Sequence, residues 1–233
     1  MKLSVQGLRS LPRCELLAVL GLQGEKHDLP QGVKVPPLAL ESFQGELRET
    51  RLTDALAGPA ARFLQVGLGK RAEVDHERLR RAAAIAARKA EKVRAASLVL
   101  WIEPGVADLA GGLAEAAQAL AEGCVLGNYA LRQFKTKPRG PYLTHVTLCG
   151  PGAEFARGAR KGELVARAST FARELQDTPA NRMRPRELVA RARALARADK
   201  QIHLRVLDER AAAPLAMGGF VSVGKGSEGW GYV

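Results

Sequence analysis

The chain has 233 residues, of which 46% are hydrophobic, and a net charge of +12. This composition indicates a globular chain with one large or two smaller domains. Because no apolar run approaches the roughly 20 residues that span a bilayer, a membrane span is excluded. Three dispersed cysteines, Cys14, Cys124 and Cys149, exclude a closed disulfide framework, so we expect a reducing, cytoplasmic location.

Short apolar runs bounded by turn residues alternate with longer helical runs through residues 1–150. The strands predicted from these runs cover residues 3–5, 16–20, 63–67, 97–102 and 145–149. Between the third and the fourth, Asp75 is a predicted N-cap of a helix. The apolar residues that recur at helical spacing after it are Leu79, Ala83, Ala86, Ala90 and Val93. The alternation predicts a layered α/β domain.

A second helix is predicted after Gly111 and Gly112, continuing toward Tyr129. Its inward residues are expected to be Leu113, Ala117, Leu120 and Cys124. A basic Pro/Gly segment over residues 135–141 separates this helix from the last predicted strand of the domain.

The remaining part of the chain begins with a helix that ends at Asp177, before Pro179. Its predicted apolar stripe consists of Leu164, Val165, Ala168, Phe171, Ala172 and Leu175. Pro185 suits the first position of another helix. That helix has the stripe Leu188, Ala192, Leu195 and Ala196. Strands are predicted over 202–207 and 220–224; because two strands are few for a domain, we expect residues 153–233 to be poorly packed or loosely docked.

Candidate metal ligands are sparse in this sequence. The histidines His27, His76, His145 and His203 are isolated and show no HxxxH, HxH or related spacing. They are interpreted as ordinary surface or strand residues. The pair Asp208 and Glu209 follows a predicted strand and is either a ligand dipeptide or a solvated turn, and we favour the turn.

Two glycine-containing segments are candidates for anion binding. The run from Gly67 to Lys70 precedes a helix and is either an anion site or a tight turn, with the turn favoured. The run from Gly219 to Gly226 is one residue short of a phosphate-binding loop, because Gly226 stands where a Ser or Thr would hold Mg²⁺.

The cysteines could act as nucleophiles only beside a histidine, and the spacing gives none. Cys14, Cys124 and Cys149 are therefore interpreted as small core residues. We assign no catalytic, cofactor-binding or metal-ligating residue in this chain.

Two basic clusters are either solvated faces or binding patches. The first consists of Arg132, Lys135, Lys137 and Arg139, and the second of Arg182, Arg184, Arg186, Arg191, Arg193 and Arg197. Only Glu187 opposes the second cluster within its span. Neither cluster is interleaved with stacking aromatic residues, which make up only 5% of the chain.

Four segments occur in an order that is more specific than any one of them. They read VGLGK from Val66, AEGCVLGNYALRQFKTK from Ala121, LQDTPANRMRP from Leu175 and MGGFVSVGKGS from Met217. In this order they resemble the leucyl aminopeptidase family, the dinuclear-metal cytosol aminopeptidases. The similarity covers nearly the whole chain, with departures at Asp177, where the family usually has Asn, and at Arg184, where it has Thr.

The resemblance implies an organisation in three parts. Residues 1–150 form a macro-domain-like α/β domain, 151–176 a linking helix, and 177–233 the start of an incomplete α/β catalytic domain. It also implies a cytoplasmic homohexamer in which two divalent metals, Zn²⁺ or Mn²⁺, activate water to hydrolyse N-terminal residues from peptides.

The family's metal ligands and catalytic Lys and Arg lie beyond the position that matches Val233. We therefore expect a C-terminally truncated chain that binds no metal and is inactive alone. The alternative is a basic nucleic-acid-binding or regulatory module derived from the N-terminal domain.

Overall fold

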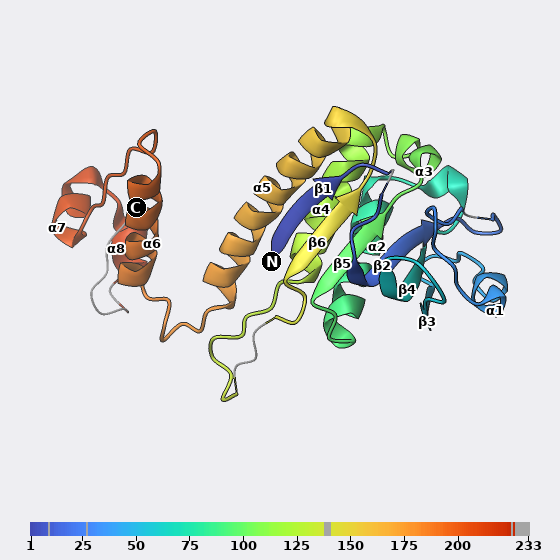
Figure 1. Ribbon diagram of the computed structural model, residues 1–233. Helices are drawn as coiled ribbons and strands as arrows, with labels where there is room; N and C mark the ends of the chain where they lie inside the picture. Colours follow the sequence, from blue (N-terminus) through green and yellow to red (C-terminus); the bar gives the residue numbers. More distant parts are fainter. Residues whose placement is uncertain (9, 27, 138–140, 225, 227–233) are drawn as a thin grey trace. The chain divides into compact units, whose positions relative to one another are not determined.

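The computed structural model describes all residues except 9, 27, 138–140, 225 and 227–233 (Figure 1). The chain divides into two compact units, Met1–Thr170 and Phe171–Val233.

A six-stranded sheet forms the centre of the first unit, in the order β1-β6-β5-β2-β4-β3. Its strands are β1 (Lys2–Gln6), β2 (Cys14–Gly21), β3 (Thr50–Asp54), β4 (Ala60–Gly67), β5 (Ser97–Trp101) and β6 (His145–Cys149). All neighbours are parallel except β3, which pairs antiparallel with β4. The five strands predicted in this part are confirmed, whereas the polar edge strand β3 was not predicted because its sequence, TRLTD, lacks an apolar run.

Strand β2 lies in the middle of the sheet, and its residues from Leu16 to Gly21 are buried. It pairs with β4 along one edge and β5 along the other, with Leu16 opposite both Arg62 and Leu98. The side chains from Leu16 to Leu20 are at most 1% exposed. A parallel strand covered on both faces reads as a continuous apolar run, and this explains why the LLAVL segment was predictable.

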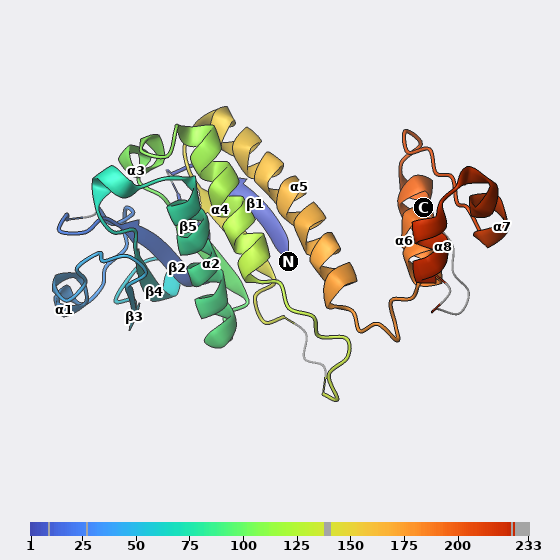
Figure 2. The ribbon, with the colours of Figure 1, turned by 180° about the vertical axis from the view of Figure 1, so that it is seen from behind.

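Three helices cover one face of the sheet: α2 (His76–Lys92), α4 (Leu113–Gly127) and the first part of α5 (Gly152–Asp177) (Figure 2). The predicted cap of α2 is confirmed, because the Asp75 carboxylate accepts a hydrogen bond from the Arg78 amide at 2.8 Å. The predicted inward residues Ala117, Leu120 and Cys124 are buried. The helix α4 ends at Gly127, before Tyr129.

The helices approach one another closely because small residues line their contacts. A Cβ atom on Gly123 of α4 would overlap the Arg80 carbonyl of α2. On α5, Gly158 and Gly162 similarly face the carbonyls of Ala114 and Gln118. Backbones packed this closely leave no room for a side chain at these positions.

The buried face of α5 differs from the predicted stripe. Its buried residues are Phe155, Gly158, Ala159, Gly162 and Ala166, whereas Leu164 is 71% exposed. The expectation of poor packing is wrong for the part of the helix that carries these residues. The predicted stripe followed the bulky apolar residues of the helix. The buried face instead carries mainly glycine and alanine, because the backbones of α4 and α5 lie too close together for larger side chains.

Loops cover the other face of the sheet. A second apolar cluster there includes Phe63, Val99 and Trp101 from the strands together with Val33 and Val35 from the long β2–β3 connection. That connection contains α1 (Pro37–Glu41), and two further short helices, η1 (Arg71–Glu73) and α3 (Pro104–Asp108), follow β4 and β5.

The second unit contains the end of α5 and the helices that follow it. These are α6 (Pro185–Ala198), α7 (Glu209–Ala212), η2 (Ala213–Leu215) and α8 (Gly218–Gly224). The predicted helix start at Pro185 is confirmed, and Arg184 precedes it without a side-chain cap. No helix in the described part of the chain has the length and apolarity to cross a membrane.

Both strands predicted in this unit are wrong. Residues 202–206 take no regular structure, Leu207 is an isolated bridge residue and not part of a strand, and residues 220–224 lie in α8. A strand needs a hydrogen-bonded neighbour, and the described residues of this unit contain no other strand. A helix instead satisfies the backbone of the FVSV segment locally.

The contact between α2 and α4 gives a stability prediction. Gly123→Ala is expected to lower the free energy of unfolding by about 1–3 kcal/mol, because the added methyl group must displace the backbone of α2. Urea denaturation of both proteins measures the change. The matched control is Gly105→Ala in α3, where the new methyl group meets only the Glu103 carboxylate at 4.0 Å. Equal urea midpoints for the two variants would contradict the close packing.

Candidate functional site

The connections that leave β2 and β4 pass to opposite faces of the sheet. The β2 connection supplies Val33 and Val35 to the loop-covered face, whereas the β4 connection leads into α2 on the helical face. Open α/β sheets bind ligands outside the carboxyl ends of strands at such a switch point. The candidate site therefore lies beyond Gly21 and Gly67, where β2 and β4 end.

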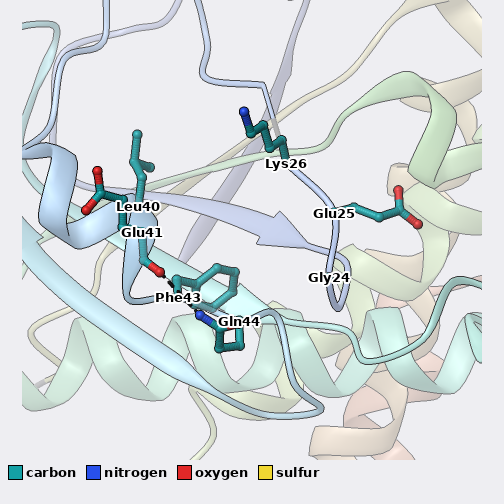
Figure 3. Close-up of a pocket in the computed structure, with 7 residues that line it drawn as sticks. All are labelled: Gly24, Glu25, Lys26, Leu40, Glu41, Phe43 and Gln44. Atoms are coloured by element: carbon teal, nitrogen blue, oxygen red, sulfur yellow. Dashed lines mark hydrogen bonds between the residues drawn. The ribbon is translucent and has the colours of Figure 1, made fainter.

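A cavity of about 480 Å³ lies beside the end of β2 (Figure 3). It is lined by Gly24, Glu25, Lys26, Leu40, Glu41, Phe43 and Gln44. Phe43 is buried, and the Gln44 side-chain amide donates to the Glu41 carbonyl at 3.2 Å. The lining combines two carboxylates and one ammonium group with an apolar wall. It offers no nucleophile beside a base, so its chemistry suits binding rather than catalysis.

An ion pair joins the loops at the switch point. The Arg71 guanidinium donates two hydrogen bonds to the Glu25 carboxylate, at 2.9 Å and 2.6 Å. Hydrogen bonding to Arg71 holds the pKa of Glu25 below its usual range. These two residues are 46 positions apart, and because no local spacing links them, the pair could not be predicted from the sequence.

Glu103, which follows β5, completes a charged cluster at this edge. Burial raises the pKa of Glu103, and the negative charges of Asp28 and Glu25 raise it further, while Arg71 acts in the opposite direction. The site therefore carries more negative than positive charge.

The segment from Gly67 to Lys70 is a tight turn, the alternative that the sequence analysis favoured over an anion site. The Leu68 amide donates to the Gly21 carbonyl at 2.9 Å, and the Gly69 amide donates to the Gly45 carbonyl at 3.0 Å. Because these donors are already used, they are not free to hold an anion. Gly69 has φ of +77°, a conformation that glycine adopts readily.

The histidines are spread over separate elements. His76 begins α2, His145 begins β6, and His203 lies outside regular structure; His27 lies outside the described residues. Across the described ranges, no group of three or more His, Cys, Asp or Glu residues could hold a metal ion. The residues that are described do not fit a dinuclear metal centre.

Asp208 has a structural role at the start of α7. Its carboxylate accepts a hydrogen bond from the Ala211 amide at 2.9 Å, and its carbonyl accepts one from Ala212. This is helix capping in a turn rather than metal coordination. The nearby glycine segment is also not a phosphate loop, because Gly219 to Gly224 lie in helix α8; Lys225 lies outside the described residues.

The cysteines behave as core residues. Burial raises the pKa of Cys14 to about 11, and those of Cys124 and Cys149 to about 12. Thiols with such values carry little thiolate near neutral pH and are poor nucleophiles. Cys124 and Cys149 are fully buried, which confirms the interpretation for these two.

The two basic clusters differ in how far their charges are paired. In the first, Arg132 pairs with Glu91 at 2.8 Å, Lys135 and Lys137 are exposed, and Arg139 lies outside the described residues. In the second, Arg184 and Arg186 pair with Glu187, and Arg191 pairs with Glu174 at 3.6 Å.

Two family models match the chain in sequence order. The N-terminal domain of the cytosol aminopeptidase family matches residues 28–138, and the catalytic domain of the same family matches residues 170–231.

Among curated proteins, a probable cytosol aminopeptidase of Geobacter sp. (strain M21) is 36% identical over 191 residues, covering 79% of this chain and 38% of that protein. One from Microcystis aeruginosa is 32% identical over 214 residues, covering 91% and 42% respectively. The chain thus spans about two fifths of the length of these relatives.

Solved structures of similar fold also match most of this chain and less than half of their own length. The bottromycin maturation enzyme BotP is similar with a TM-score of 0.74 and 26% identity, covering 92% of this chain and 44% of BotP. A mutant of tomato leucine aminopeptidase has a TM-score of 0.75 at 19% identity, covering 95% of this chain and 48% of its own, and shows the fold alone.

The charged cluster gives a pH-dependent prediction. Because the pKa of Glu103 is higher in the folded protein than in the unfolded chain, ionised Glu103 lowers the free energy of unfolding at high pH. This destabilisation disappears at low pH, where Glu103 is protonated in both the folded and the unfolded state. Glu103→Gln is therefore expected to raise the melting temperature at about pH 7 and to leave it unchanged at about pH 3. Thermal unfolding followed by circular dichroism measures both values.

Asp28→Asn serves as the linked control, because it removes one negative neighbour of Glu103. It should stabilise the protein near neutral pH, but not when Gln already occupies position 103. Additive effects of the two substitutions would contradict the coupling.

Proposed function

Because the chain belongs to the cytosol aminopeptidase family, we propose that it is the N-terminal portion of a metal-dependent aminopeptidase that hydrolyses N-terminal residues from peptides. The order of the two domain matches along the chain carries this proposal. The first unit contains the whole of the N-terminal domain match, and the catalytic-domain match begins at the last residue of that unit.

The catalytic metals are assigned to polypeptide outside the described residues. Two divalent ions, Zn²⁺ or Mn²⁺, follow from the family resemblance, and a solved complex of the similar enzyme BotP contains Mn. Such ions activate a water molecule as the nucleophile and require several converging carboxylates. Since the described residues contain no metal-binding group of three, the chain alone is proposed to bind neither ion and to be inactive.

The first unit is proposed to support the enzyme rather than perform its chemistry. Its cavity at the carboxyl end of β2 has the lining of a binding pocket and no catalytic pair. For the whole enzyme we propose a cytoplasmic homohexamer acting on peptides; the cytosolic location agrees with the name that the curated relatives carry.

The proposal predicts the outcome of a simple assay. The purified chain is expected to show no hydrolysis of leucine p-nitroanilide, with or without added Mn²⁺, because the residues that the structure describes contain no group of three metal ligands. Release of p-nitroaniline at increasing Mn²⁺ concentration measures the activity. Metal-stimulated turnover would show that the described chain assembles an active centre by itself.

Nucleic-acid binding is a second candidate function, supported by unpaired arginines of the second unit. Arg182 precedes α6, and Arg193 and Arg197 lie on it. Within the part of the chain that is described, these three have no ion-pair partner. Free guanidinium groups on one short helix and its preceding turn are available for phosphate contacts.

This alternative predicts salt-dependent binding to duplex DNA. Replacing Arg193 and Arg197 with Gln is expected to weaken binding and to reduce the slope of log affinity against log salt, because fewer phosphates are neutralised. Fluorescence anisotropy at two salt concentrations measures both quantities. The matched control is Arg186→Gln, since Arg186 is already paired with Glu187 at 2.9 Å. Undetectable or salt-insensitive binding would remove the candidate.

A further inference from the structure

The cavity beside the end of β2 lies between two walls that backbone contacts hold together. One wall is the loop over residues 24–26, and the other is α1 with the turn that follows it. The Gly24 amide of the first wall donates to the Gln44 carbonyl of the second at 3.1 Å. A Cβ atom on Gly45 would overlap the Leu22 carbonyl, so the backbones on the two sides lie in direct contact. These contacts fix the shape of the cavity before a ligand enters, as in most small-molecule sites.

Three charged side chains line this cavity, and one of them is already paired. The Glu25 carboxylate accepts two hydrogen bonds from Arg71, and in Figure 3 it points away from the Phe43 ring. Within the described part of the chain, the Lys26 ammonium and the Glu41 carboxylate have no hydrogen-bond or ion-pair partner. One positive and one negative charge are therefore available to a ligand.

The two available charges come from opposite walls, and apolar side chains complete the lining (Figure 3). Lys26 belongs to the loop and Glu41 to α1. The Phe43 side chain, which is 7% exposed, and the half-buried Leu40 supply the apolar surface. The volume of about 480 Å³ lies within the range of roughly 300–1,000 Å³ that is typical of small-molecule sites. The cavity thus offers a cation, an anion and an apolar surface to one ligand.

The surrounding charges disfavour a phosphate or another purely anionic ligand. Asp28 and Glu25 lie close enough to Glu103 to raise its pKa, so the edge of the sheet is already negative. Phosphate sites usually supply several cationic groups or free backbone amides. Here Lys26 is the one cationic side chain among the lining residues, and the amides of the turn over residues 67–70 are used within the protein. A bare metal ion fits no better, because the described residues contain no group of three ligands.

We propose that this cavity binds a zwitterion with an apolar side chain, namely an amino acid or a dipeptide of the leucine or phenylalanine type. Glu41 accepts hydrogen bonds from the ammonium group of the ligand, and Lys26 donates to its carboxylate. Hydrogen bonds between oppositely charged groups are stronger than those between neutral groups. The apolar side chain of the ligand packs against Phe43 and Leu40. This inference does not rest on the proposed function, although peptide hydrolysis would release ligands of the same class.

Isothermal titration calorimetry of the full chain, without added metal, tests the site. The probes are L-leucine and L-leucyl-L-leucine, each also in its C-terminal amide form and in its N-acetyl form. The expected result is saturable one-to-one binding of one or both zwitterions, and the tighter of the two identifies the ligand as an amino acid or a dipeptide. Amidation or acetylation is expected to weaken binding about tenfold or more, because each removes one charged hydrogen-bonding group.

Two substitutions assign the two ends of the ligand to their partners. Lys26→Gln is expected to weaken binding of the zwitterion about tenfold and to leave binding of its amide form unchanged, because that form has no carboxylate. Glu41→Gln should weaken binding of the zwitterion by a similar factor and leave binding of the N-acetyl form unchanged. The matched controls are Lys34→Gln and Glu46→Gln, whose exposed side chains belong to the same β2–β3 connection but are not among the lining residues. Both controls should leave the affinity unchanged.

Three results would overturn the proposal. The first is the absence of saturable binding by both zwitterions, and the second is an equal loss of affinity in the cavity variants and the controls. The third is tighter binding of inorganic phosphate than of either zwitterion. Because the titration measures binding and not hydrolysis, failure here would leave the proposed aminopeptidase function untouched, and failure of that function would leave this site intact.

Discussion

Every strand needs a hydrogen-bonded neighbour and parallel strands must also be covered on both faces, and the rest of this structure depends on these requirements. In the first unit, β2 pairs with β4 and β5, while helices cover one face and loops the other. Because both faces are covered, the connection after β2 passes to the loop-covered face and the connection after β4 passes to the helical face. The switch point, the ion pair between Glu25 and Arg71 and the adjacent cavity follow from this routing.

The same requirement explains why the second unit differs from the first. Its segments at 202–207 and 220–224 have strand-like composition, yet no neighbouring strand is available among the described residues. The FVSV segment forms part of α8, where its backbone groups are satisfied without a neighbour. Phe220 and Val223 of this segment then remain exposed.

The large buried core and the match to a catalytic domain lie in different units of the chain. The first unit contains the sheet, the large buried core and a cavity without a catalytic pair. The second unit matches a catalytic domain but contributes little core of its own. A family motif at the junction, from Leu175 to Pro185, therefore identifies the family without placing an active centre within the described residues.

The sequence by itself determined the local features. The buried strand at 16–20, the Asp75 cap and the Pro185 helix start were predictable because each depends on a short run of residues. Tertiary structure alone decided which side of α5 is buried, since the close contacts at Gly158 and Gly162 depend on α4. It also decided the pairing of Glu25 with Arg71, because these residues are 46 positions apart in the sequence. It decided the helical state of α8 as well, because the described residues of the second unit offer no strand with which this segment could pair.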